Sequence, residues 1–180
     1  MHRREFIGGS ALLMFGAPFA KPYPIQSQTT PRGPELTDKL SAAEIEIVNQ
    51  SVMAKDMDHF FGNGYSCAEA GIAVALRFLK KPENLFWVAS AFGGGLYNRD
   101  LCGFLTAGEM AIGLHAGELK LERKMAKETC GRNARALWQW WASTAPLHCA
   151  EIREGRTDYK VCSRLGRLAF AKIEELIKAT

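Results

Sequence analysis

Apolar residues recur every three or four positions along most of the chain, which is the spacing of one face of an α-helix. From Ser41 onward, no segment alternates apolar and polar residues as a half-buried strand does. The pattern therefore predicts an all-α fold, a single bundle-like domain of about six or seven helices over residues 36–180.

The first predicted helix begins at Ser41, because Ser41 and Glu44 form a capping box. It is expected to end at Asn63-Gly64, a pair typical of helix termination. Its inward face would carry Ile45, Val48, Val52, Met57 and Phe60.

A second capping box, formed by Ser66 and Glu69, predicts another helix that ends before Pro82. One face of this helix would carry Cys67, Gly71, Val74 and Phe78. A short helix is expected to follow over residues 84–92.

Three consecutive glycines come next, at positions 93–95. A phosphate-binding loop needs a preceding strand and, in the P-loop, a following Lys-Ser/Thr, and the sequence has neither here. Gly93 is expected to end a helix in the left-handed conformation, and Gly94 and Gly95 to let the backbone approach another group closely.

The second half of the chain predicts four more helices. One begins near Asp100, whose carboxylate would cap its first turn. A long helix over residues 118–143 follows, then a short helix that starts at 144–146, and a last helix capped by Asp158. The expected inward faces are Ala126, Cys130, Ala134, Leu137 and Trp141 on the long helix, and Leu165, Ala169, Ile173 and Leu176 on the last one.

The first 35 residues differ from this helical domain. Residues 1–20 pair Arg3 and Arg4 with an apolar stretch, as in a twin-arginine export signal whose receptor reads the two arginines. Residues 21–35 are rich in proline and polar residues and are expected to form a flexible tether. The signal predicts export of the folded protein to the periplasm with cleavage after Ala20, and an uncleaved signal would instead anchor the chain.

The composition fits one soluble globular domain with a sizeable core. Of the 180 residues, 47% are hydrophobic and 23% are charged. No apolar run reaches the roughly 18 residues that a membrane-spanning helix needs. The formal net charge is +4, but the basic residues are scattered, so nucleic acid is excluded as the expected partner.

Four of the five cysteines fall within about the first four residues of a predicted helix. Helix N-termini present unpaired amides and a partial positive charge, and both favour the thiolate form of cysteine. These four cysteines are Cys67, Cys102, Cys149 and Cys162. Cys130 lies in mid-helix on an apolar face and is expected to be a buried small hydrophobe.

The spacing of these four cysteines leaves three kinds of site open. They are separated by 35, 47 and 13 residues and no pair is C-x-x-C, so a shared site can form only on folding. Four thiolates can hold an iron–sulfur cluster, form two disulfides, or bind a structural zinc ion. The export signal favours the cluster, because the twin-arginine route carries proteins that have already folded around a cofactor.

The order of the motifs resembles the C_GCAxxG_C_C family of redox-active proteins. The resemblance runs from Phe61 to Leu176 and rests on "SCAEAG", then "AFGGG" before "LCGFLTAGEMAIGL", then the last two cysteines. It implies that Cys67 is the first family cysteine, Cys102-Gly103 the second, and Cys149 and Cys162 the last two.

The chain departs from the family pattern directly after the second cysteine. Phe104 replaces the family's alanine and Ala107 its final glycine, although Gly108 follows. These replacements call into question the close backbone packing beside Cys102.

The residues and the resemblance together predict an exported redox protein that transfers electrons through an iron–sulfur cluster held by the four cysteines, with a [2Fe–2S] cluster favoured. The implied partner is a membrane-associated or periplasmic oxidoreductase, and the chain would serve it as an accessory subunit rather than as an independent enzyme. One alternative is a thiol–disulfide redox protein that uses the same cysteines in pairs. Another is a structural interaction module stabilised by disulfides or zinc.

Three further side chains are candidates near the site. His148 precedes Cys149 and could ligate a metal or accept a proton, although a partly buried polar role is the simpler interpretation. Arg99 could steady an anionic cluster, and a solvated loop charge is its simpler interpretation. Glu69 could relay protons, but its capping box already accounts for it.

The run "LWQWW" places three tryptophans on the long helix. Trp138 and Trp141 share a helical face and are expected in the core. Trp140 points elsewhere and is expected to mark an interface with a partner or with a second copy in a homodimer.

Overall fold

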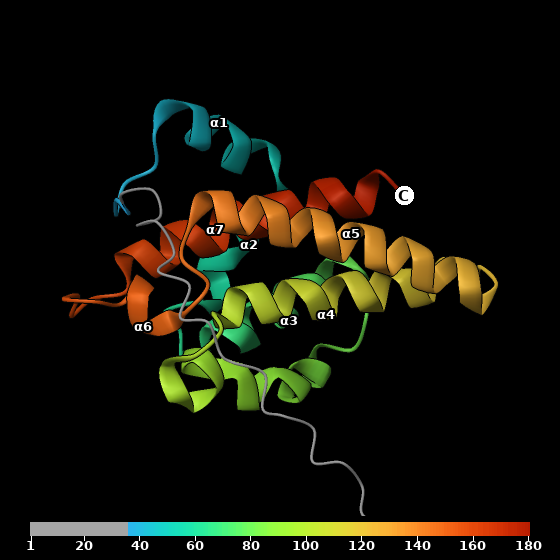
Figure 1. Ribbon diagram of the computed structural model, residues 1–180, viewed down its shortest axis with the longest axis horizontal. Helices are drawn as coiled ribbons and strands as arrows, with labels where there is room; N and C mark the ends of the chain where they lie inside the picture. Colours follow the sequence, from blue (N-terminus) through green and yellow to red (C-terminus); the bar gives the residue numbers. More distant parts are fainter. Residues whose placement is uncertain (1–35) are drawn as a thin grey trace, which may run out of the picture. The chain divides into compact units, whose positions relative to one another are not determined.

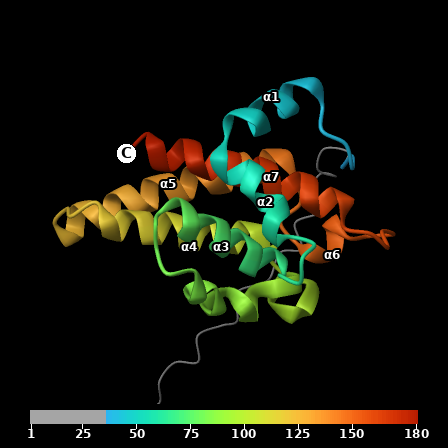
Figure 2. The ribbon, with the colours of Figure 1, turned by 180° about the vertical axis from the view of Figure 1, so that it is seen from behind.

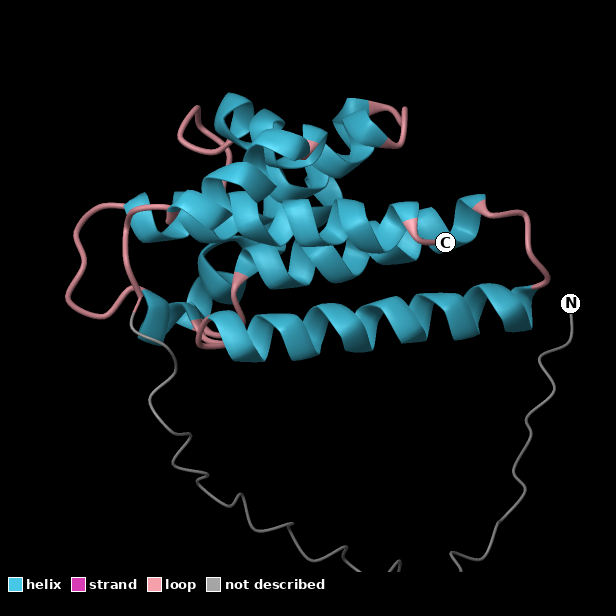
Figure 3. Cartoon of the chain, turned by 90° about the horizontal axis from the view of Figure 1, so that it is seen from above, coloured by secondary structure: helices cyan, strands magenta, loops and turns pink. Residues whose placement is uncertain are grey.

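The computed structural model describes residues 36–180, and over this range the chain consists of helices joined by loops (Figure 3). The predicted all-α fold is confirmed, because the described range contains isolated β-bridges but no β-strand. The elements are α1 (Ala42–Gln50), α2 (Val52–Phe60), α3 (Cys67–Phe78), the 3₁₀ helix η1 (Glu83–Phe92), the π-helical turn η2 (Gly95–Arg99), α4 (Gly103–Glu118), α5 (Arg123–Thr144), α6 (Cys149–Ile152) and α7 (Lys160–Lys178).

Helix α3 lies at the centre of this domain, where it contacts α2, α4, α7 and η1. Every residue from Ala70 to Leu76 is buried. A Cβ added to Gly71 would lie 2.8 Å from the Cβ of Ala107 and 2.6 Å from the ring of Phe170, so the glycine lets α4 and α7 approach closely. Helices α4 and α5 run side by side in opposite directions (Figure 1), and α2 packs against α7 (Figure 2).

The first predicted helix is in fact two helices, α1 and α2, which meet at Ser51. Ser51 has an extended backbone, and its hydroxyl accepts the N–H of Ala54 at 3.0 Å. The same hydroxyl donates to the carboxylate of Glu174 on α7 at 2.6 Å, and that carboxylate also accepts the N–H of Met53 at 2.8 Å. The first turn of α2 is therefore capped partly by Glu174, a residue far away in the sequence.

Because of this break, the expected apolar face of the first helix is only partly correct. Val48, Met57 and Phe60 are buried as predicted. Ile45 and Val52 were expected to face inward, but they are 47% and 54% exposed. The break at Ser51 changes the direction of the chain, so one helical stripe cannot continue across it.

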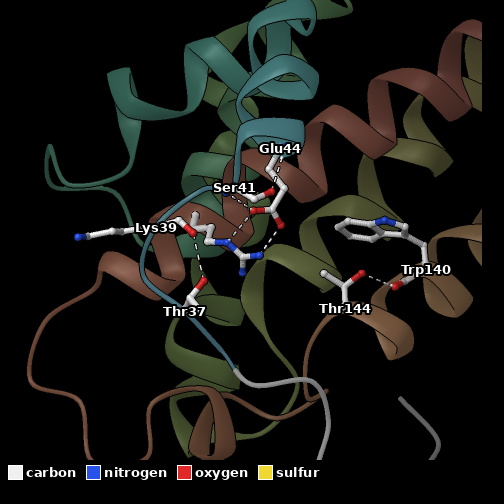
Figure 4. A network of polar contacts seen from close by, with 7 residues as sticks. Thr37, Lys39, Ser41, Glu44, Trp140 and Thr144 are labelled. Atoms are coloured by element: carbon white, nitrogen blue, oxygen red, sulfur yellow. Dashed lines mark hydrogen bonds and ion pairs between the residues drawn. The ribbon is translucent and has the colours of Figure 1, made fainter.

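Both predicted capping boxes are present. At α1, Ser41 accepts the N–H of Glu44, whose carboxylate accepts the N–H of Ser41 at 2.8 Å (Figure 4). Ser66 and Glu69 make the same reciprocal pair at the start of α3. Glu44 also forms an ion pair with Arg164, which fastens α1 to α7.

Three of the later helices begin after their predicted starts. Helix α5 begins at Arg123 instead of residue 118, and the other two are α4 and α6. Helix α4 begins at Gly103, so the expectation that Asp100 caps it is wrong; the Asp100 carboxylate contacts Nδ1 of His148 at 2.9 Å instead. The short helix α6 begins at Cys149, whereas residues 144–146 form the end of α5 and the turn after it. Before both α4 and α6, a short non-helical segment precedes the first residue of the helix.

Helices α5 and α7 bury most of their predicted faces. The N-cap of α7 is Tyr159 rather than the predicted Asp158, although the Asp158 carboxylate accepts the N–H of Lys160, the first residue of the helix, at 3.2 Å. On α7, Leu165, Ala169 and Ile173 are buried and Leu176 is half-buried. On α5, Leu137 and Trp141 are buried, and Ala126, Cys130 and Ala134 are half-buried.

The three tryptophans of α5 are arranged differently from the prediction. Trp141 is fully buried and donates Nε1–H to the Pro146 carbonyl at 2.9 Å. Trp138 is 42% exposed, so its placement in the core is wrong. Trp140 is half-buried and packs against the core. The buried stripe of α5 follows positions four residues apart, through Leu137 and Trp141, which leaves Trp138 beside it.

The glycine run has a different geometry from the one predicted. Gly93 has a φ of −59° and does not adopt the left-handed conformation, which begins at Gly94 with a φ of +60°. A Cβ at Gly93 would lie 2.7 Å from the Cβ of Ser66, so Gly93 is needed for packing rather than for its conformation.

The predicted export signal with Arg3 and Arg4, and the tether over residues 21–35, lie outside the described residues. Both therefore stay predictions. In the part of the chain that the structure describes, no helix is both long enough and apolar enough to cross a membrane.

Candidate functional site

Cys67, Cys102, Cys149 and Cys162 line one cavity of about 860 Å³. Cys67 is the first residue of α3, Cys102 directly precedes α4, Cys149 is the first residue of α6, and Cys162 lies in the first turn of α7. Figure 1 shows the starts of α4, α6 and α7 at the same end of the domain. The predicted placement at helix starts is therefore correct. All five cysteines are free thiols, and Cys130 on α5 is not among the cavity's lining residues.

Two backbone hydrogen bonds join the segment that contains Cys102 to the segment that contains Cys149. The N–H of Cys102 donates to the Leu147 carbonyl at 2.9 Å, and the N–H of Cys149 donates to the Asp100 carbonyl at 2.7 Å. The pair forms an isolated antiparallel bridge between the segments that lead into α4 and α6. Neither segment carries a local ligand motif, so the geometry arises only when the helices assemble.

Two glycines give the cysteines room to approach the backbone. A Cβ on Gly103 would overlap Sγ of Cys67 and would lie 3.0 Å from the amide nitrogen of Ala68. Gly95, which has a φ of +68°, lies equally close to Cys149, because a Cβ there would be 2.8 Å from the Cβ of Cys149. The expected close approach at the glycine run therefore occurs at Gly95.

The surroundings of Cys102 disfavour its thiolate. Burial raises the pKa of the Cys102 thiol well above its ordinary value, and the neighbouring Cys67 and Cys162 raise it further. Hydrogen bonds from the N–H groups of Phe104 and Leu105, at the start of α4, lower the pKa and offset only part of this rise. The amides at the start of α4 therefore favour the thiolate of Cys102 as expected, but desolvation outweighs them at this position.

Two arginines line the same cavity and favour the thiolate form. Burial raises the pKa of Cys149, and the charges of Arg99 and Arg153 lower it in part. Burial also raises the pKa of Cys162 to about 11, although Arg153 opposes this with its charge and a hydrogen bond. Arg99 was only a secondary candidate from its place in the sequence, and Arg153 was not predicted at all. Arg153 follows Cys149 by four residues, a spacing of one helical turn that could have identified it.

Aromatic side chains form another part of the lining. The ring of Phe61 meets the ring of Phe104 edge-on at 5.0 Å and that of Tyr159 at 6.2 Å between centroids. Phe104 is fully buried, and a Cβ on Gly166 of α7 would lie 2.7 Å from its ring. Phe104, which stands where the resemblance expects alanine, therefore packs tightly against α7 and does not loosen the backbone beside Cys102.

His148 and Glu69 lie near the cavity but are not among its lining residues. The contact of His148 with Asp100 supports the junction between the two cysteine-bearing segments. Glu69 accepts a hydrogen bond from the Ser90 hydroxyl at 2.6 Å, in addition to its capping role. Burial alone would raise the pKa of Glu69, but the hydrogen bonds from Ser90 and Ser66 outweigh it and lower the pKa.

The four thiols share a cavity, but they do not form a preassembled site for one metal ion. Within residues 36–180, no three His, Cys, Asp or Glu side chains lie close enough together to hold one metal ion. A zinc ion requires each sulfur to lie about 2.3 Å from the same point. An iron–sulfur cluster instead distributes its thiolates over several irons. The four thiols come from four elements and line one cavity.

One protein family matches the chain over residues 65–176, a span that contains all four cavity cysteines. That family is described as "Putative redox-active protein (C_GCAxxG_C_C)". Searches of curated proteins and of solved structures find no match to the chain.

Proposed function

The chain belongs to the C_GCAxxG_C_C family of redox-active proteins, and from this premise we propose that it transfers electrons through an iron–sulfur cluster. Cys67, Cys102, Cys149 and Cys162 supply the four thiolates. The observation that carries the proposal is that these cysteines, which come from four separate elements, all line one cavity. A bound cluster would take up and release single electrons.

The protein's own groups would stabilise negative charge in this cavity. The N–H groups of Phe104 and Leu105 donate toward Sγ of Cys102, and hydrogen bonds of this kind tune the potential of a sulfur-ligated centre. Arg99 and Arg153 add two positive charges to the lining. Phe104, which is fully buried, lines the cavity beside Cys102.

The raised pKa values couple metal binding to proton release. A cysteine ligates a metal as the thiolate and not as the thiol. Cys102 and Cys162 must therefore lose their protons when a cluster is inserted. Their pKa values are above the ordinary value of a cysteine thiol, so they are neutral at pH 7 before the metal arrives. Cluster insertion is therefore expected to be favoured by a higher pH.

A second candidate function is thiol–disulfide redox chemistry with the same cysteines. Cys67 lies near enough to Cys102, Cys149 and Cys162 to raise the pKa of each, so it is the natural partner for a disulfide. Oxidation of two thiols to one disulfide would release two protons and pass two electrons to an external disulfide. Exchange begins with a thiolate, which burial disfavours at Cys102, Cys149 and Cys162.

We also propose that the protein works in the periplasm beside a membrane-associated or periplasmic oxidoreductase, as an accessory electron carrier. The Arg3-Arg4 pair before an apolar stretch supports export by the twin-arginine route. Replacing both arginines with lysine is expected to leave the protein in the cytoplasm. Equal periplasmic amounts of the variant and the native chain would contradict this route.

The proposed function is tested by spectroscopy on the full-length protein purified without oxygen. An iron–sulfur cluster is expected to give a broad visible absorption that bleaches with dithionite, together with an electron paramagnetic resonance signal in one redox state. The iron count distinguishes the two-iron form favoured by the sequence from a four-iron form. A colourless, metal-free protein with titratable thiols would support disulfide chemistry, and zinc as the only metal would indicate a structural site.

A further inference from the structure

The cavity beside the four cysteines is larger than a cluster needs. Its volume of about 860 Å³ is that of a small-molecule site, since such pockets measure roughly 300–1,000 Å³. A cluster of a few iron and sulfur atoms would leave most of this volume free. The remaining lining residues therefore indicate what else the cavity can hold.

The charged lining of the cavity is entirely positive. Among the described residues, Arg99 and Arg153 are the charged side chains that line it, and no carboxylate does. Within residues 36–180, neither Arg99 nor Arg153 forms an ion pair with a carboxylate. Arg153 donates to the Asp158 carbonyl and to Cys162, and both guanidinium groups retain further donors for an anion.

The backbone holds Arg99 in an unusual conformation at the cavity. Arg99 has a φ of +58°, and Leu96 and Tyr97 also have left-handed φ values, of +57° and +56°. The turn is closed by a hydrogen bond from the N–H of Asp100 to the Gly95 carbonyl at 2.9 Å. Left-handed non-glycine residues cost free energy and persist where the surrounding structure fixes them, which is common at ligand-binding sites.

Aromatic side chains make up a large part of the rest of the lining. They include the rings of Phe61, Tyr65, Phe104 and Tyr159. The guanidinium group of Arg153 lies 3.9 Å from the centroid of the Tyr159 ring, so one cation is already placed beside an aromatic face. Large apolar surfaces with a few convergent polar groups are typical of sites for organic ligands.

We propose that this cavity binds a small organic anion with a flat apolar body, next to the four cysteines. Arg99 and Arg153 bind the acidic group, and the aromatic side chains pack against the body of the ligand. The proposal goes beyond electron transfer and does not require a cluster, because none of these contacts involves a metal.

Two fluorescent probes test the proposal on the full-length protein. One is 8-anilinonaphthalene-1-sulfonate, and the other is N-phenyl-1-naphthylamine, which has the same rings without the sulfonate. We expect saturable binding of both, with the sulfonate bound more tightly. Arg99→Gln and Arg153→Gln should each weaken sulfonate binding about tenfold, as for a lost charge-assisted hydrogen bond, and should leave the neutral probe unchanged. Tyr159→Ala should weaken both probes.

Matched variants locate the probe. Arg132→Gln removes an exposed arginine on α5 outside the cavity, and Trp87→Ala removes a side chain on η1 that is 68% exposed. Neither change should alter binding of either probe. Loss of binding in Trp87→Ala, or unchanged sulfonate affinity in both cavity arginine variants, would overturn the proposal. Circular dichroism checks that each variant folds. If Arg153→Gln does not fold, the test rests on Arg99→Gln, because Arg99 is exposed.

This test and the test of the proposed function fail separately. A protein without iron that still binds the sulfonate through Arg99 would retain the anion site and lose the electron-transfer role. A protein with a cluster that binds neither probe would retain the electron-transfer role and lose the anion site.

Discussion

The N–H of Cys149 donates to the carbonyl of Asp100 at 2.7 Å, across a sequence separation of 49 residues. With the matching bond from Cys102 to Leu147, it joins the segments that lead into α4 and α6. Two of the four cavity cysteines are thus positioned by backbone hydrogen bonds between distant segments. The site and the helical assembly should therefore be lost together when either is disturbed.

Gly103→Ala is expected to disturb both the site and the fold. The added Cβ would overlap Sγ of Cys67, and the amide of Ala68 lies 3.0 Å away, so neither neighbour can move without cost. We expect the free energy of unfolding to fall by about 1–3 kcal/mol, as for an overpacked core, and the bound iron to fall with it. Urea denaturation and metal analysis measure the two effects.

Gly113→Ala is the matched control in the same helix. Gly113 is exposed, and nothing lies within 4 Å of a Cβ added there. Alanine should therefore stabilise α4 by about 0.5–1 kcal/mol and leave the iron content unchanged. If Gly103→Ala behaved like this control, the close approach of the backbone to Cys67 would not matter for the site.

Because of Glu109 on α4, we expect the protein to lose stability as the pH rises. Burial raises the pKa of its carboxyl group to about 7, so the folded chain retains a proton that the unfolded chain releases at about pH 4.3. The neutral Glu109 carboxyl group contributes fully to the free energy of unfolding below about pH 4.3. This contribution declines as the pH rises toward 7. Glu109→Gln removes this decline, so the melting temperature of the variant relative to the native chain should increase between about pH 5 and pH 8. A constant difference over that range would argue against a buried, protonated Glu109.

Glu174 predicts the opposite pH dependence. Burial alone would raise its pKa, but hydrogen bonds from Lys178, Ser51 and the Met53 amide outweigh burial and lower it. Its contribution is therefore complete above about pH 4.3 and is lost as the pH falls through the lowered value. Glu174→Gln should destabilise the protein by about 1–3 kcal/mol at neutral pH, with a smaller deficit in acid.

Urea denaturation at about pH 7 and pH 3.5 measures this change in the deficit. Glu175→Gln provides the control, because Glu175 is exposed and its replacement should alter stability by no more than about 0.5 kcal/mol. A Glu174→Gln deficit that is the same at both pH values would show that the charge of Glu174 does not stabilise the junction at Ser51.

The local parts of the fold could be predicted from the sequence. The capping boxes at Ser41 and Ser66 depend on residues three positions apart, so the pattern of the sequence contains both partners. The break at Ser51 could not be predicted, because Glu174, 123 residues away, stabilises it. Trp138 was misplaced for a similar reason, since the packing of α5 against its neighbours decides which side of the helix is buried.

In the candidate site, too, the local features could be predicted and those that depend on distant contacts could not. The four cysteines could be identified from their positions at helix starts and from the family motif, but their convergence depends on the junction between Asp100 and Cys149. The raised pKa values of Cys102, Cys149 and Cys162 could not be predicted, because burial causes them and burial is a property of the assembled fold. Arg153, which lines the cavity, directly follows α6. This helix has 4 residues, and its predicted start was too early.

The most direct test of the electron-transfer account is the iron and acid-labile sulfide content of three proteins purified without oxygen. These are the native chain, Cys102→Ser and Cys130→Ser, which compare a cysteine that lines the cavity with one that does not. The account predicts stoichiometric iron and sulfide in the native chain and in Cys130→Ser, and their loss in Cys102→Ser. A native chain without iron, or a Cys102→Ser protein that retains as much iron and sulfide as Cys130→Ser, would contradict it.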